Sequence, residues 1–257
     1  MNYFIEGLQG SGKSTALRKI TEKYDSLTPI HEGDYSPVEL AWCAYTTEEE
    51  YSSILRRFAP IRRSIEAKTV SEDDRRIISY TQVQTDIPDF YQTLEQYEIY
   101  NGRKPLDEFR EIVLRRYSRW TGDNMVFECS LFQNIIEDMI LFRSLSDDEI
   151  MQFYRSVRDA LEHQDFRIIY IRSDDIAGNL SVIRKERSDE NGNELWFPMM
   201  CGFFNDSPYA KANGLSGEDD LIRHFAHRQG LELRICSELF PDKTTILSSK
   251  QFDDITL

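Results

Sequence analysis

The chain has 257 residues, a net charge of −14 and 40% hydrophobic residues, with 15 Phe and 13 Tyr among them. Its length and apolar content are sufficient for a sizeable core in one α/β domain. The negative charge argues against two classes of partner: a nucleic-acid polymer, which requires a basic surface, and an anionic membrane. It does not exclude a nucleotide, because one cationic pocket is enough to bind it.

The four cysteines are far apart and form no Cys-x-x-Cys pair, so we expect reduced thiols and neither a zinc site nor thioredoxin-type chemistry. The N-terminus lacks a basic segment followed by an apolar run, from which we expect no signal peptide. No stretch reaches about 18 apolar residues, the length of a membrane span. Together these features predict a cytoplasmic protein.

The N-terminal segment combines a strand, a glycine-rich loop and a helix. Tyr3–Ile5 is an apolar run that predicts a buried strand, and apolar residues at spacings of 3 and 4 predict a helix over Thr15–Tyr24. Between them, residues 7–14 read Gly-Leu-Gln-Gly-Ser-Gly-Lys-Ser, which matches the phosphate-binding loop pattern. The flanking strand and helix are the context that this pattern requires.

Each part of this loop has a role in binding phosphate. Glycines permit backbone conformations that let the loop N–H groups surround a phosphate, and the following helix adds its positive end. Lys13 would reach the β- and γ-phosphates, and the Ser14 hydroxyl would ligate Mg²⁺. The predicted nucleotide-binding residues are Gly7, Gln9, Gly10, Ser11, Gly12, Lys13, Ser14 and Thr15.

A short second strand is expected to end near residues 30–32, so that Glu32 and Asp34 follow its carboxyl end. Ligands of open α/β sheets bind outside this end, where a carboxylate can orient or deprotonate an acceptor hydroxyl. We favour Glu32 for this role and assign Asp34 to substrate binding, although either one can be the base. The alternative interpretation is a polar turn with no catalytic role.

Residues 46–120 are expected to form a largely helical region. Thr46 to Glu49 is interpreted as a capping box that starts one helix, Ser71 as the N-cap of a second, and Pro105 as the opening of a third.

Two polar groups within this region are candidates for substrate contacts. Gln82, expected on a helix beside Tyr80, can hydrogen-bond a base or a sugar, and Arg119 belongs to a basic group with Arg115 and Arg116. The alternatives are an ordinary helix surface and surface salt bridges.

Met125–Phe127 predicts a short buried strand that ends in Glu128. A carboxylate at this place resembles the Walker-B position, which holds Mg²⁺ directly or through water. Glu128 is therefore predicted as a metal ligand together with Ser14, and also as part of the substrate site. The alternative is an acid that only complements a helix dipole.

The remaining strands and helices are expected in alternation. They are a helix over 131–142, a helix opened by a capping box at 146–149, a strand over 166–171, a basic helical segment, a long functional loop over 188–217, a helix over 219–239 with a break allowed at Gly230, and a strand over 244–247. Alternating strands and helices predict a three-layer α/β/α fold with a parallel central sheet.

Arg184 and Arg187 lie in the basic segment at a spacing of three, which places them on one helical face. Two guanidinium groups arriving together can neutralise the charge that develops on a transferring phosphoryl group. A solvated charged face is the alternative.

In this order, the motifs resemble the nucleoside and nucleoside-monophosphate kinases, especially the deoxynucleoside kinase and thymidylate kinase branch. Gly7–Thr15 matches the phosphate loop of the family, Glu32 falls where that branch carries an acid used on the sugar hydroxyl, and Arg184–Arg187 is similar to its arginine-bearing lid. Residues 128–130 resemble its Glu-Arg-Ser element with cysteine in place of arginine, and residues 80–86 are similar to the helix whose glutamine reads the base.

The resemblance implies a P-loop NTPase fold of the nucleotide kinase type, with residues 1–257 as a single domain. Residues 46–120 would be the substrate side, and residues 184–217 a lid with a long loop. It further implies ATP and Mg²⁺ as cofactors, and transfer of the γ-phosphate to a small acceptor such as a nucleoside or nucleoside monophosphate. The catalytic residues would be Lys13, Glu32, Arg184 and Arg187.

Two other functions stay open: a P-loop kinase for a non-nucleotide metabolite, and a nucleotide-binding regulatory or interaction protein without turnover. A GTPase switch is disfavoured because the guanine-reading Asn-Lys-x-Asp element is absent. A transporter ATPase is disfavoured because Leu215–Gly217 is not followed by an apolar strand ending in Asp-Glu. We expect no nucleic-acid polymer and no membrane as partner, and a homodimer stays open.

Overall fold

The computed structural model describes residues 1–249, and contacts within the chain divide it into two compact units. The first unit contains residues 1–29 and the chain from residue 121 onward. The second unit contains residues 30–120.

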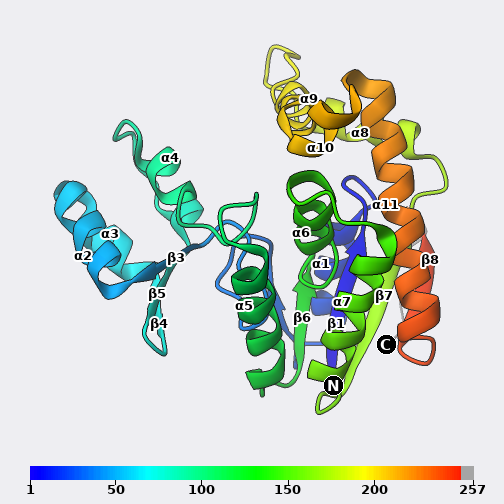
Figure 1. Cartoon of the computed structure of the whole chain (residues 1–257), viewed down its shortest axis with the longest axis horizontal. Coiled ribbons are helices and arrows are strands. Elements are labelled where there is room, and N and C mark those ends of the chain that lie inside the picture. Colours follow the sequence, from blue (N-terminus) through cyan, green and yellow to red (C-terminus); the bar gives the residue numbers. More distant parts are fainter. Residues whose placement is uncertain (250–257) are drawn as a thin grey trace. The chain divides into compact units, whose positions relative to one another are not determined.

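The centre of the first unit is a five-stranded, all-parallel sheet with the order β2-β6-β1-β7-β8 (Figure 1). Its strands are β1 (Asn2–Gly7), β2 (Thr28–Ile30), β6 (Met125–Glu128), β7 (Phe166–Arg172) and β8 (Thr244–Ser248). β1 pairs with β6 on one side and β7 on the other, so that Ile5 lies opposite both Glu128 and Ile169. The carboxyl ends of these three strands therefore lie at one edge of the sheet.

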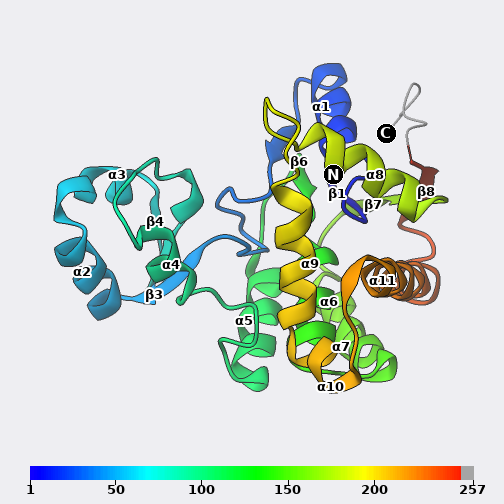
Figure 2. The same ribbon diagram turned by 90° about the horizontal axis from the view of Figure 1, so that it is seen from above.

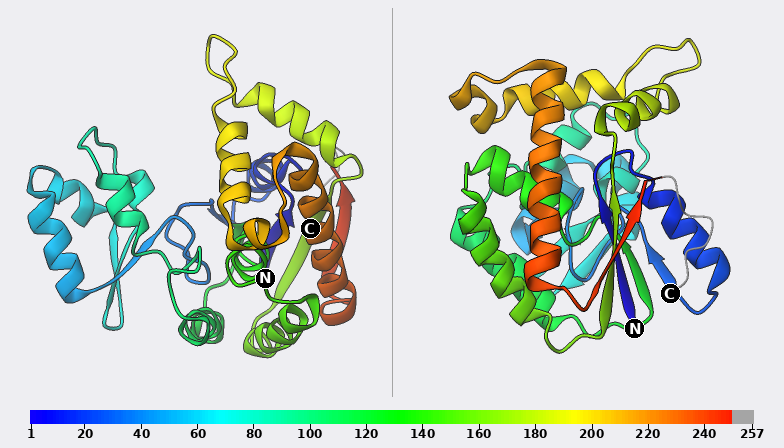
Figure 3. Two further views of the ribbon diagram at one scale, coloured as in Figure 1. Left: turned by 45° about the horizontal axis from the view of Figure 1, so that its top comes forward. Right: turned by 90° about the vertical axis from the view of Figure 1, so that its right-hand side faces the viewer.

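Helices cover both faces of this sheet, as expected for three layers (Figure 3, right). The helices of the first unit are α1 (Lys13–Lys23), α6 (Gln133–Glu137), the π-helix η3 (Asp138–Phe142), α7 (Asp147–Ala160), α8 (Ile176–Glu186), α9 (Trp196–Asp206), α10 (Pro208–Asn213) and α11 (Gly217–Leu239). Alternate residues of β1 face opposite layers: Ile5 packs with Leu17 and Ile20 of α1, whereas Phe4 stacks on Phe127.

Several sequence predictions for the first unit are confirmed. The strands at 3–5, 125–127, 166–171 and 244–247 are present, and Ser146 forms a capping box with Glu149 at the start of α7. The break allowed at Gly230 is not used, since α11 continues through it. No helix within residues 1–249 is both long and apolar enough to cross a membrane.

The long loop expected over 188–217 is wrong, because most of it is helical. Figure 2 shows α9 and α10 beside α11. Phe197 and Phe204, seven residues apart, share one face of α9 and are buried. Ser207 caps α10 by accepting a hydrogen bond from the N–H of Ala210. Phe197 and Phe204 therefore anchor α9 to the core.

The second unit contains a three-stranded antiparallel sheet with the order β3-β5-β4. Its elements are β3 (Ala44–Thr47), α2 (Glu48–Arg57), the 3₁₀ helix η1 (Ala59–Ile61), α3 (Arg62–Ala67), β4 (Thr69–Glu72), β5 (Arg75–Ile78), the 3₁₀ helix η2 (Tyr80–Gln82), α4 (Phe90–Glu95) and α5 (Leu106–Arg119). Its core contains Ile54, Phe58, Ile78 and Phe90.

The expectation of a largely helical region over 46–120 is wrong at residues 69–78, which form a hairpin. Asp73 adopts a left-handed φ of 52°, and the two residues 73–74 connect β4 to β5. Aspartate tolerates this conformation better than most residues. The polar run after Ser71, interpreted as a helix N-terminus, is therefore a turn.

The predicted helix starts in this unit are close to the observed ones. The capping box lies one residue later than expected, at Thr47 and Glu50, while the Thr46 hydroxyl donates to the carbonyl of Arg76 (2.9 Å). Pro105 is the N-cap residue of α5.

Candidate functional site

The glycine-rich loop between β1 and α1 adopts the turn that its sequence predicts. Gly7 and Gly10 have φ values of 140° and 76°. A Cβ added at Gly7 would lie 2.4 Å from the carbonyl oxygen of Ile171, so the close approach to β7 requires glycine. α1 begins at Lys13. The N–H groups of its first turn, which have no partner within the helix, therefore point toward the loop.

Lys13 is buried at the mouth of this loop. Its ammonium group donates to the carbonyl oxygens of Gly7 and Leu8, both at 2.8 Å. The carbonyl groups of the loop therefore bind the Lys13 ammonium at the place where bound phosphates are expected.

Ser14 and Glu128 are brought together as the sequence predicts. Because β6 lies next to β1, Glu128 at the end of β6 reaches the first turn of α1, where the Ser14 hydroxyl donates to its carboxylate. Mg²⁺ is typically held by one or two protein oxygens, with phosphate oxygens and water completing an octahedron. The Ser14–Glu128 pair fits this requirement.

No complete protein cage for a metal is present among residues 1–249: three or more His, Cys, Asp or Glu side chains are nowhere grouped to hold one. A metal at Ser14 and Glu128 therefore depends on ligands from a bound phosphate.

The other predicted loop residues occupy different environments. Gly10 packs against α8, because a Cβ there would lie 3.3 Å from the carbonyl oxygen of Asn179. Ser11 is fully buried, and its hydroxyl has no hydrogen-bond partner within residues 1–249. Thr15 is exposed on the first turn of α1.

The sequence interpretation missed a buried charged cluster behind the loop, formed by Gln9, Glu137, His224, Arg228 and Glu232. Arg228 is completely buried; it donates to the Gln9 side-chain oxygen (2.7 Å) and to the carboxylate of Glu137, and forms an ion pair with Glu232 (3.1 Å). His224 contacts the second oxygen of Glu137 (2.6 Å). The sequence contained a signal for this cluster: His224, Arg228 and Glu232 recur every four positions, among the apolar residues that α11 buries.

Two carboxyls near the loop have opposite pKa shifts. Burial alone would raise the pKa of Glu137, but His224 and Arg228 outweigh it and lower that pKa to about 2. Burial raises the pKa of Glu6 to about 8, although Glu6 accepts hydrogen bonds from the N–H groups of Leu131 (2.7 Å) and Phe132 (3.3 Å).

The Glu6 shift predicts a pH dependence of stability. The native chain keeps this proton up to about pH 8, whereas the unfolded carboxyl releases it near the ordinary value of 4.5. The unfolding free energy should therefore fall as the pH rises from about 5 to 8, and Glu6→Gln should remove about 1 kcal/mol per pH unit of that slope. Urea unfolding at several pH values measures it, and an identical slope in both proteins would contradict the assignment.

The two predicted lid arginines lie at the end of α8. Arg184 pairs with Glu194 (2.8 Å) and Glu218 (2.9 Å), and its guanidinium lies 4.0 Å from the ring centroid of Phe197. Arg187 lies over the ring of Trp196 at 4.9 Å. Both cations are thus held by neighbouring residues of the first unit.

In the second unit, Asp34 and Gln82 are brought together. The Gln82 amide donates to the Asp34 carboxylate, and its oxygen accepts a hydrogen bond from Lys68 (2.9 Å). Gln82 is the last residue of the short 3₁₀ helix η2 and does not lie on an α-helix. The carboxylate of Glu32 accepts from the indole N–H of Trp42 (3.3 Å).

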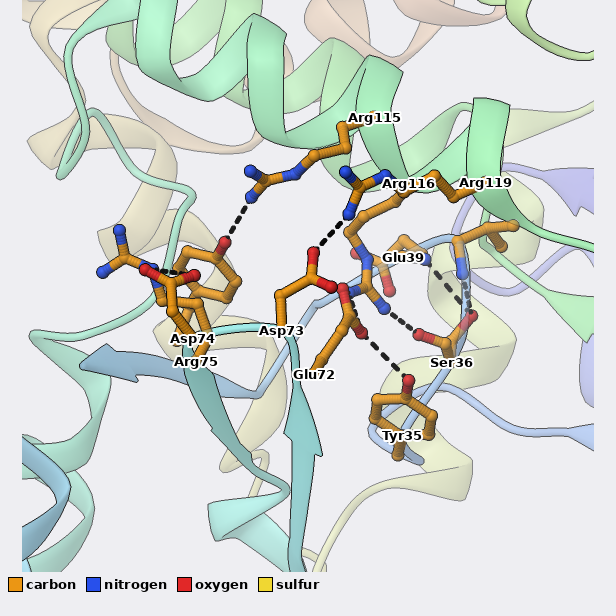
Figure 4. A network of polar contacts seen from close by, with 12 residues as sticks. Tyr35, Ser36, Glu39, Glu72, Asp73, Asp74, Arg75, Arg115, Arg116 and Arg119 are labelled. Carbon is orange, nitrogen blue, oxygen red and sulfur yellow. Dashed lines mark hydrogen bonds and ion pairs between the residues drawn. The ribbon is translucent and has the colours of Figure 1, made fainter. Parts of the chain in front are cut away.

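The basic group on α5 is divided among different partners (Figure 4). Arg119 forms an exposed ion pair with Asp73 in the hairpin turn, and Arg115 donates to the Tyr45 hydroxyl (2.6 Å). Arg116 is buried and donates to the Glu72 carboxylate and to the carbonyl oxygen of Ser36. Arg116 is thus the member of the basic group that connects three segments of this unit.

Comparison with protein-family models and with curated proteins finds no match for this chain.

Proposed function

We propose that this protein is a P-loop kinase that uses ATP and Mg²⁺ to phosphorylate a small-molecule acceptor, with a nucleoside or nucleoside monophosphate as the first choice. The observation that carries the proposal is the juxtaposition of the glycine-rich loop, the buried Lys13 ammonium and the Ser14–Glu128 pair at the carboxyl ends of β1 and β6. In P-loop enzymes these three elements act together on the β- and γ-phosphates and on Mg²⁺.

In this proposal each group of the first unit has a defined task. The loop N–H groups and the N-terminus of α1 bind the phosphates, and Lys13 exchanges the carbonyls of Gly7 and Leu8 for phosphate oxygens. Ser14 and Glu128 hold Mg²⁺, which when bound offsets phosphate charge. Arg184 and Arg187 would approach the transferring group after leaving their present partners.

The acceptor residues follow from the resemblance. Glu32 would take the proton of the acceptor hydroxyl, with Asp34 as the alternative base. The oxygen of that hydroxyl would bond to the γ-phosphorus as the bond from the γ-phosphorus to ADP breaks and ADP departs. Gln82, Arg119 and Glu128 would contact the acceptor. A metabolite other than a nucleoside remains the second choice for the acceptor.

The proposal further includes a cytoplasmic location and no partnership with nucleic-acid polymers or membranes. It is supported by the net charge of −14, which disfavours anionic surfaces, and by four cysteines that form no disulfide, which suits a reducing compartment.

The deciding experiment measures ADP release from Mg–ATP by the purified protein with panels of nucleosides, monophosphates and sugars. At least one acceptor should stimulate ADP release well above the rate without acceptor. Nucleotide binding with no acceptor-stimulated turnover would contradict the kinase proposal and favour a nucleotide-binding interaction protein.

A further inference from the structure

Arg228 joins the buried cluster to the loop by its contact with the side chain of Gln9. Arg228 donates to the Gln9 oxygen at 2.7 Å, from a position on α11 with no exposure to solvent. The guanidinium of Arg228 also pairs with the carboxylates of Glu137 and Glu232, and it lies over the ring of Phe225. Burying a guanidinium is costly unless it is paired, and both carboxylates meet this need without Gln9.

The contact with Arg228 determines the orientation of the Gln9 amide. A guanidinium group has only donors, so the Gln9 atom that faces it must be the oxygen. The two amide N–H donors of Gln9 are then directed away from Arg228.

Gln9 lies at the end of the loop that is marked by the Lys13 ammonium. That ammonium bonds to the carbonyls of Gly7 and Leu8, the residues directly before Gln9. Because a lysine in this loop serves the β- and γ-phosphates, Gln9 belongs to the terminal-phosphate end. Its side chain is partly exposed, so a ligand can reach it.

We propose that Arg228 is a positioning residue: it fixes the Gln9 amide so that the N–H donors of Gln9 bind the terminal phosphate of the nucleotide. This inference rests on the proposed function, since it requires ATP in the loop. It adds a side-chain donor that distinguishes the triphosphate from the diphosphate, and it explains why a buried cation contacts the loop.

The test compares the affinities for Mg–ATP and Mg–ADP, measured by titration calorimetry, in wild type, Gln9→Met, Arg228→Met and the double variant. Gln9→Met and Arg228→Met should each weaken ATP about tenfold, the loss expected for one hydrogen bond to a charged group, and leave ADP within about twofold. The double variant should lose no more than either single variant, because Arg228 acts through Gln9.

Gln9→Met keeps the inference testable if Arg228→Met fails to fold, because it leaves every ion pair of the cluster intact. A second readout is the side-chain amide signal of Gln9 in ¹H–¹⁵N NMR spectra, assigned by its loss in Gln9→Met. This signal should shift with Mg–ATP and stay in place with Mg–ADP.

Three results would overturn the inference. One is an unchanged ATP-to-ADP affinity ratio in Gln9→Met; another is an Arg228→Met variant that loses stability but keeps that ratio, which indicates a structural role alone. The third is a wild type that binds neither nucleotide, which would remove the proposed function as well. The first two leave the proposed function standing, so the two failures are distinguishable.

Discussion

Replacing Lys13 by Ala should lower acceptor-stimulated phosphotransfer by about 10²- to 10³-fold, the effect of removing one preorganised donor from a developing negative charge. The ammonium is buried and already held at the loop by two carbonyls, so it has only to exchange these two hydrogen bonds for bonds to the phosphates. Initial rates of ADP release at saturating acceptor measure the effect.

The matched control is Lys23→Ala, since Lys23 lies in the last turn of the same helix and is exposed. This variant should keep the wild-type rate. Equal rates for wild type and Lys13→Ala would show that the turnover does not occur at this loop.

The second large effect concerns stability. Glu137→Gln should lower the unfolding free energy by about 3 kcal/mol at pH 7, because the shift of the Glu137 pKa from 4.5 to about 2 measures how strongly the native state prefers the carboxylate. The physical reason is the pairing with Arg228 and His224.

The pH dependence of this loss follows from the sign of the shift. A depressed pKa stabilises the native state above the unfolded value, and the contribution disappears as the pH falls through the native value. The difference between wild type and Glu137→Gln should therefore shrink between about pH 5 and pH 2. Denaturant unfolding measures it, with the exposed Glu162→Gln as the control. A difference that stays constant over this range would contradict the assigned pairing.

The arrangement of the glycine-rich loop, Ser14 and Glu128 could be predicted because it is encoded locally. Residues 7–14 form a continuous motif, and Glu128 follows an apolar strand directly, so that strand adjacency alone brings it to Ser14. The three-layer arrangement followed from the alternation of apolar strands and amphipathic helices.

Long-range charge pairing could not be predicted in the same way. Arg228 and Arg116 can be buried because they pair with Glu137 and Glu72. These partners lie 91 and 44 residues away in the chain, so no local pattern indicates the pairing. The hairpin over 69–78 was missed because Ser71 and the acids after it suit a helix N-terminus and a tight turn equally well. In the segment 188–217, polar composition concealed the spacing of Phe197 and Phe204.

A crystal structure grown with Mg²⁺ and a non-hydrolysable ATP analogue would show whether the loop after β1 binds a nucleoside triphosphate, as we propose. We predict phosphates enclosed by residues 7–14, with the Lys13 ammonium moved from the carbonyls of Gly7 and Leu8 onto phosphate oxygens. An empty loop with Lys13 still bonded to those carbonyls would contradict the account.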